Sequence, residues 1–304
     1  MVKQYQKESL TALVERDYQL ALKKLVSADK LASPTKNNKL KAAIKIGSAN
    51  VNYIIKNFQK AESEAAHAIT LLSDLDEKSL LAQSYSLYGL IQTRLDNFRD
   101  AEESIQSANN IYVSLGDESG QAEMIFARGV LEERRGNFKN AINYFDAAVP
   151  LFQNVNLNYL EAYSHLNKAN AYLYLDSGDP AQNLIESKKA LETALKIIDT
   201  KPYANLIVQG HQIASMIAMR ENNLELAQQE FQLYTAKNDS LNQVYIHAIS
   251  TGVDENANVN DYETIIATQL NAINDQRRSI NFGKMTTGLS IALIVILSLL
   301  TRSL

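Results

Sequence analysis

The chain has 304 residues, no cysteine and a formal net charge of −4, and 46% of its residues are apolar. Without cysteine it can form no disulfide, no catalytic thiolate and no cysteine-based metal site. The mildly negative balance gives no electrostatic basis for binding nucleic acid, and the apolar content is that of a folded protein.

Residues 1–22 have the pattern of an amphipathic helix and lack the apolar centre of a secretory signal. They also contain the start of the first copy of a motif that recurs every 40 residues. The motif is Asp or Asn, then an aromatic residue, then alanines three and ten positions after the aromatic residue. Its copies are Asp17, Tyr18, Ala21 and Ala28; Asn57, Phe58, Ala61 and Ala68; Asn97, Phe98, Ala101 and Ala108; Asn137, Phe138, Ala141 and Ala148. A fixed period of this size predicts a solenoid of stacked units, none of which buries its apolar face alone.

Each unit is predicted to hold two helices, A and B, which in the second unit cover about 40–56 and 58–72. The Asp or Asn of the motif is expected to cap helix B through its side chain. The aromatic residue is expected to pack into the turn between the two helices. Helix A carries a small residue twelve positions before the first alanine, namely Ser9, Ala49, Gly89 and Gly129. Polar turns at 33–38, 74–79, 115–120 and 153–158 separate the units. Pro150, late in a helix B, is expected to kink or end that helix.

Two weaker units follow. The fifth keeps Ala169, Ser187, Leu191 and Ala194 and has six extra residues, expected in the loop around 175–183. In the sixth, Tyr234 replaces the last alanine, which is typical of a terminal, capping unit. The predicted units span 2–38, 39–79, 80–120, 121–158, 159–204 and 205–238.

In residues 2–236, the units carry a small residue on helix A, followed on helix B by an aromatic residue, an alanine, a bulky apolar residue and a second alanine. This order resembles the pattern of the tetratricopeptide repeat family, although the first-helix tryptophan of that family is absent. The resemblance implies an all-α solenoid of about six helix hairpins. It also implies that helix A lines a concave surface that binds a protein or peptide partner. The positions that would face the partner are Ile46, Asn50, Tyr53, Leu90, Thr93, Phe126, Val130, Glu133, Tyr163, Leu166, Asn170, Leu173, Met216 and Met219. For each of these residues, packing against a neighbouring helix is the open alternative.

We find no pattern that indicates chemistry. The four histidines do not pair at metal-ligand spacing, and the glycines form no phosphate-binding loop. The sequence therefore predicts no catalytic site, no cofactor and no metal. The clamp by which tetratricopeptide co-chaperones hold a chain end is also missing, because Leu87 stands where that family has Asn, and Glu123 and Ala127 stand where it has cations.

Past Asp239 the repeats stop. The sequence predicts a short helix and a polar loop over 239–260, a juxtamembrane helix over 261–284, and a transmembrane helix over the uncharged residues 285–301. Ile266, Ile273 and Ile280 recur at seven, and Gly288 and Ala292 form a small-residue pair, so these five are candidate contacts of a homodimer. The alternative for residues 261–284 is a surface helix, and the alternative for residues 285–301 is a buried core helix.

This order resembles the sensor half of bacterial membrane-bound tetratricopeptide sensor histidine kinases, without the kinase core, which a missing continuation of the chain would carry. The resemblance implies a signalling input module in the bacterial inner membrane, with the repeats in the periplasm. Arg277, Arg278 and Lys284 precede the predicted span and only Arg302 follows it, which instead favours repeats in the cytoplasm. The alternative function is therefore a tail-anchored, cytoplasm-facing adaptor that recruits partners to a membrane.

Overall fold

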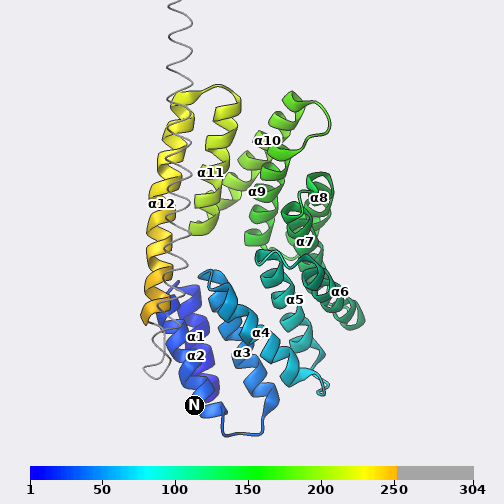
Figure 1. Ribbon diagram of the computed structural model, residues 1–304, viewed down its shortest axis with the longest axis vertical. Helices are drawn as coiled ribbons and strands as arrows, with labels where there is room; N and C mark the ends of the chain where they lie inside the picture. The colour runs from blue at the N-terminus through cyan, green and yellow to red at the C-terminus, as the bar shows by residue number, and fades with distance from the viewer. Residues whose placement is uncertain (252–304) are drawn as a thin grey trace, which may run out of the picture. The chain divides into compact units, whose positions relative to one another are not determined.

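The computed structural model of the chain describes residues 1–251, and these residues form helices and turns without a strand (Figure 1). The helices are α1 (Val2–Val14), α2 (Tyr18–Ala32), α3 (Asn38–Ile54), α4 (Phe58–Leu72), α5 (Lys78–Arg94), α6 (Phe98–Leu115), α7 (Glu118–Arg134), α8 (Phe138–Asn154), α9 (Asn158–Tyr174), α10 (Pro180–Thr200), α11 (Ala204–Arg220) and α12 (Leu224–Thr251). Each odd-numbered helix packs against the next even-numbered one, which gives six hairpins and confirms the predicted all-α solenoid.

The odd-numbered helices form the inner layer of this solenoid. From α1 to α11, each of them contacts the next odd-numbered helix. Within residues 1–251, no even-numbered helix touches the even-numbered helix of the following unit. The array therefore curves with the A helices on the inside and the B helices on the outside, as the resemblance to the tetratricopeptide repeat family implies.

The alanines of the repeated motif occupy equivalent buried positions in their units. All eight of them, from Ala21 to Ala148, have an exposed fraction of 0%. Opposite them, the small residue of helix A allows close approach: a Cβ atom added at Gly89 would lie 2.9 Å from Ile105 Cγ1 and 3.3 Å from the Ala101 carbonyl oxygen. Since interiors are close-packed, these positions accept little extra volume.

The turn between helices A and B is also repeated. The residue before the Asp or Asn has a positive φ, at 63° for Arg16 and Lys56 and 61° for Asp96, and at 81° for Gly136. The next backbone N–H then donates to the carbonyl five residues earlier, for example from Asn57 to Asn52 at 2.8 Å. This pairing closes the end of helix A with a left-handed residue.

The predicted capping role is confirmed at Asp17 and wrong at the three asparagines that follow. The Asp17 side chain accepts from the Leu20 N–H at 2.9 Å. Asn57, Asn97 and Asn137 make no such bond. Each donates instead through Nδ2 to the side chain five residues earlier, over 2.7–3.0 Å.

The residue five positions earlier explains this difference. It is polar before each asparagine: Asn52, Gln92 or Glu132. It is alanine before Asp17 and before Asn223, and there the side chain caps helix B. A polar partner on helix A thus draws the amide away from the helix end.

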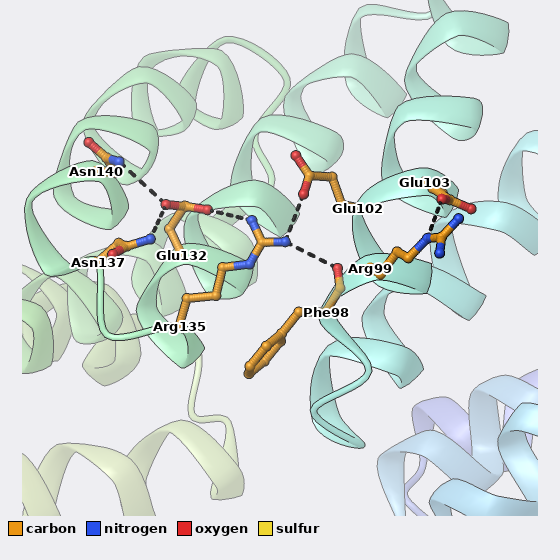
Figure 2. A network of polar contacts seen from close by, with 8 residues as sticks. All are labelled: Phe98, Arg99, Glu102, Glu103, Glu132, Arg135, Asn137 and Asn140. Carbon is orange, nitrogen blue, oxygen red and sulfur yellow. Dashed lines mark hydrogen bonds and ion pairs between the residues drawn. The ribbon is translucent and has the colours of Figure 1, made fainter.

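At Glu132 the repeated contact grows into a network between units (Figure 2). The Glu132 carboxylate accepts from Asn137, which precedes α8, and from Asn140 of α8, and it pairs with Arg135 at 3.0 Å. Arg135 also reaches α6, where it donates to the Phe98 carbonyl and pairs with Glu102 at 2.7 Å. Figure 2 shows this guanidinium between the two units, which it therefore links along with their apolar packing.

Two predicted helix ends are absent. Pro150 does not end α8, which continues to Asn154. The sequence boundary at Asp239 falls inside α12, which runs without interruption from Leu224 to Thr251. Neither Pro nor Gly stands between these ends, so nothing in the local chemistry stops the helix. The predicted helix and span over 261–301 lie outside the described residues, and among the described helices none is long and apolar enough to cross a bilayer.

The last described helix, α12, returns to the beginning of the array, where it packs against α2 (Figure 1). The rings of Tyr18 and Tyr245 meet edge to face with their centroids 5.7 Å apart. Lys56 Nζ lies 3.4 Å from Asn242 Oδ1 and 5.7 Å from the centroid of the Tyr245 ring. Helix α12 therefore connects back to the first two units. We call its contacts with Tyr18 and Lys56 the ring closure.

Candidate partner-binding site

The residues predicted to line the concave surface fall into two groups. Five of them are buried in the core, with exposed fractions of 5% or less: Thr93, Phe126, Val130, Leu166 and Leu173. The others are half-buried, or exposed in the case of Met219: Ile46, Asn50, Tyr53, Leu90, Glu133, Tyr163, Asn170, Met216 and Met219. The buried five pack against neighbouring helices, as Phe126 does against the rings of Phe145, Phe152 and Tyr163. Only the second group can contact a partner without repacking of the core.

Side chains from three other units converge on Arg94, at the end of α5. Arg94 Nη2 donates to the Tyr163 hydroxyl of α9 at 2.6 Å. Arg94 Nε lies 3.5 Å from the Tyr53 hydroxyl of α3. With Glu133 of α7 and Asn170 of α9, these residues form a group that we call the Arg94 cluster. The curvature of the array creates it, because 69 residues separate Arg94 from Tyr163.

Glu133 is the acid of this cluster. Its Oε1 accepts from Asn170 Nδ2 at 2.6 Å. Burial raises the pKa of this carboxyl to about 7, against the smaller opposing effects of the Asn170 bond and of the charges on Arg94 and Arg134. Near neutral pH, a large share of Glu133 is therefore protonated.

Tyr163 and its neighbour Tyr159 remain neutral. Burial raises the pKa of Tyr163 and of Tyr159. Tyr159 lies next to Tyr163, at 5.9 Å between ring centroids, and its hydroxyl accepts from Asn205 Nδ2 at 2.8 Å. The rings provide apolar area and each hydroxyl keeps a proton, so the surface combines contact area with hydrogen-bond donors.

Sequence reasoning found Tyr53, Glu133, Tyr163 and Asn170 but missed Arg94. The positions of the family pattern that face a partner end one residue before it, at Thr93. The equivalent position of the next unit is Arg134, which pairs with Asp96 at 2.6 Å. Nothing in the sequence separates these two arginines, because their different roles depend on how far the array curves.

His165 lies on α9 and His211 lies on α11. The ring of His165 is half-buried, and burial lowers its pKa. His211 Nδ1 lies 2.7 Å from Glu230 Oε2. No group of three His, Cys, Asp or Glu side chains within residues 1–251 is placed to hold a metal ion. The candidate dimer contacts Ile266, Ile273, Ile280, Gly288 and Ala292 lie outside the described residues.

The chain resembles solved solenoids in structure. A Rap protein complexed with Competence and Sporulation Factor has a TM-score of 0.65 and 14% identity, over 90% of this chain and 74% of that one. The apo form of RapI has 0.58 and 12%, over 80% and 99%. PilW, a widely conserved type IV pilus biogenesis factor, has 0.52 and 15%, over 80% and 96%. No protein-family model and no curated protein matches this chain. At these identities the likeness shows the fold, a tetratricopeptide-like α-solenoid.

Proposed function

We propose that this chain is a scaffold that binds a protein or peptide segment on the inner face of its solenoid. The observation that carries the proposal is the Arg94 cluster, in which α3, α5, α7 and α9 present polar side chains to one place. A site built from several units suits an extended segment better than a small molecule, because such a segment contacts many units at once.

The apolar residues of the inner face would anchor the partner. Ile46, Leu90 and Met216 are half-buried, and Met219 has an exposed fraction of 54%. Methionine side chains adapt to different partners, and apolar anchors supply most of the affinity in such surfaces. The solved Rap protein, which was crystallised in complex with Competence and Sporulation Factor, is a precedent for a bound solenoid of this fold.

A display library of random peptides tests the proposal. The full chain should enrich a set of peptides, and Leu90→Glu on the inner face should abolish that enrichment. Val113→Glu is the matched control, because Val113 is exposed on the outer helix α6. Lack of enrichment over an unrelated protein, or equal enrichment by Leu90→Glu, would count against the proposal.

Our finer proposal is that the scaffold is the input part of a bacterial membrane signalling system and performs no catalysis itself. It rests on the sequence alone, on the uncharged residues 285–301 and on the order of segments. A reporter fused to residue 1 distinguishes this periplasmic input module from the cytoplasm-facing adaptor, since it would be active on only one side. Release of the full chain from membranes by alkaline carbonate would oppose both versions.

Dimerisation through 261–301 belongs to the signalling proposal. Cross-linking of the full chain in mild detergent should trap a dimer, and Gly288→Leu should weaken it by obstructing close helix approach. A chain that is monomeric before and after this substitution would remove dimerisation from the mechanism.

A further inference from the structure

The positive charge of Arg94 has no carboxylate partner within residues 1–251. Arg99, Arg134 and Arg135, by contrast, each pair with a carboxylate at 2.6–3.0 Å. Arg94 is half-buried, and its hydrogen-bond partners among the described residues are two neutral hydroxyls, which it contacts through Nε and Nη2. Its Nη1 has no bond to the described part of the chain, so one edge of the guanidinium can still donate.

The hydroxyls around Arg94 add donors and no charge. Tyr53 and Tyr163 each accept from the guanidinium, and an arginine can only donate. The proton of each hydroxyl is therefore free to point at a further acceptor, and none is found among the described residues. The cluster thus presents N–H and O–H groups that need an acceptor from outside.

Neighbouring charges leave this place positive. Glu133 is the acid whose charge acts on Arg94, but it forms no ion pair with it at 4.0 Å or less, and its pKa of about 7 keeps much of it uncharged. Glu133 therefore offsets only part of the positive charge of Arg94.

We infer that the Arg94 cluster binds a carboxylate of the partner, with the guanidinium edge of Arg94 and the hydroxyls of Tyr53 and Tyr163 as donors. A carboxylate fits because its two oxygens accept from a guanidinium side by side. The inference rests on the proposed function, and it names the chemistry at the centre of that site. An Asp or Glu side chain and a free chain end are the two possible sources.

Synthetic nonapeptides of random sequence, coupled to a support through their N-termini, test this inference with the labelled full chain. They are made in matched sets: Asp and Glu kept or replaced by Asn and Gln, and the C-terminus free or amidated. We expect removal of one carboxylate to weaken the bound peptides by about 10-fold or more, the usual range for a hydrogen bond to a charged group. The modification that weakens binding identifies the source.

Three variants make the test specific. Arg94→Gln should bind the acidic and neutralised peptides equally, whereas Arg99→Gln, on the outer helix α6, should keep the wild-type preference. Tyr163→Phe keeps the ring and Arg94, so it should lose only part of the preference even if Arg94→Gln folds poorly. Circular dichroism checks that each variant is folded.

The outcomes separate the two proposals. Peptides that bind with no preference for a carboxylate, in wild type and Arg94→Gln alike, would overturn the carboxylate site and leave the scaffold function standing. An unchanged acidic preference in both Arg94→Gln and Tyr163→Phe would overturn it as well. If the wild-type chain binds no peptide at all, the proposed function fails, and the carboxylate site fails with it.

Discussion

Substitution of Gly129 by alanine tests the packing register most directly. Gly129 lies on α7 opposite Phe145 of α8, and an added Cβ would lie 2.6 Å from Cε1 and 2.8 Å from Cδ1 of that ring. Favourable carbon contacts begin at about 3.5 Å, so the ring or the helix must move by roughly 1 Å. The ring is fully buried and packs against Phe126 at 5.8 Å between centroids, which leaves it little room.

The magnitude follows from two opposing effects. Overpacking of a filled core costs about 1–3 kcal/mol, whereas exchanging glycine for alanine inside a helix favours folding by about 1 kcal/mol. Because the Phe145 ring has so little room, we expect an overpacking cost in the upper part of this range, about 2–3 kcal/mol. Gly129→Ala should therefore lower the free energy of unfolding by about 1–2 kcal/mol after the helix preference for alanine is subtracted.

Gly210→Ala is the matched control in another A helix, α11. Its added Cβ would meet only Leu195 Cδ2, at 3.2 Å. Leu195 has an exposed fraction of 37%, so the end of this flexible side chain can turn away. The helix preference for alanine then dominates, and Gly210→Ala should be neutral or more stable than wild type by up to about 1 kcal/mol.

Urea unfolding, followed by far-ultraviolet circular dichroism, measures both variants. Phe145→Leu introduced into Gly129→Ala should recover part of the loss, because the shorter side chain makes room for the new methyl group. If Gly129→Ala proves as stable as wild type, or if the two alanine variants shift equally, our account of close approach at the small-residue position is refuted.

Three further predictions follow from the polar contacts. Asn97→Asp should lower the free energy of unfolding by about 1–3 kcal/mol, because the buried Gln92 loses its hydrogen-bond donor. Asn223→Asp should be nearly neutral, because either side chain can cap the helix. Equal shifts of the urea midpoint in the two variants would contradict this reasoning. Since the pKa of Glu133 is about 7 in the fold and 4.5 in the reference state, the folded chain binds more protons between these values, and stability should fall as pH rises through them. Glu133→Gln should remove this slope in melts from pH 5 to 8, and an unchanged slope would show that other groups cause it. Tyr245→Ala should open the ring closure and speed hydrogen exchange in both α2 and α12, whereas faster exchange in α12 alone would mean that this contact is not the one that holds them together.

The sequence predicts those parts of the fold that depend on contacts inside a unit or between neighbours. The alanines at positions 21, 61, 101 and 141 share one environment because every unit repeats the same helix crossing. The capping prediction is wrong at Asn57, Asn97 and Asn137 because it rests on the general preference for Asn at the residue before a helix. The alternation between alanine and a polar residue five positions earlier carried the missing signal.

The candidate site could be predicted only in part. The residues of the inner face follow from the resemblance to the tetratricopeptide repeat family, but burial divides them according to how closely each pair of inner helices packs. The contacts of Arg94 and the ring closure depend on the curvature of the array. This curvature is the sum of a small rotation between each pair of units, and no single residue indicates it. The sequence accordingly named Tyr53 and Tyr163 but could not show that one arginine joins them.

The contact between α12 and α2 also constrains how such a chain can evolve. An open stack tolerates the gain or loss of a copy, since each unit depends only on its neighbours. In this chain, inserting or deleting one unit would part Tyr18 from Tyr245, and both ends would lose their partners at once. Copy number is thus fixed by geometry, and removing residues from either end should loosen the opposite end too.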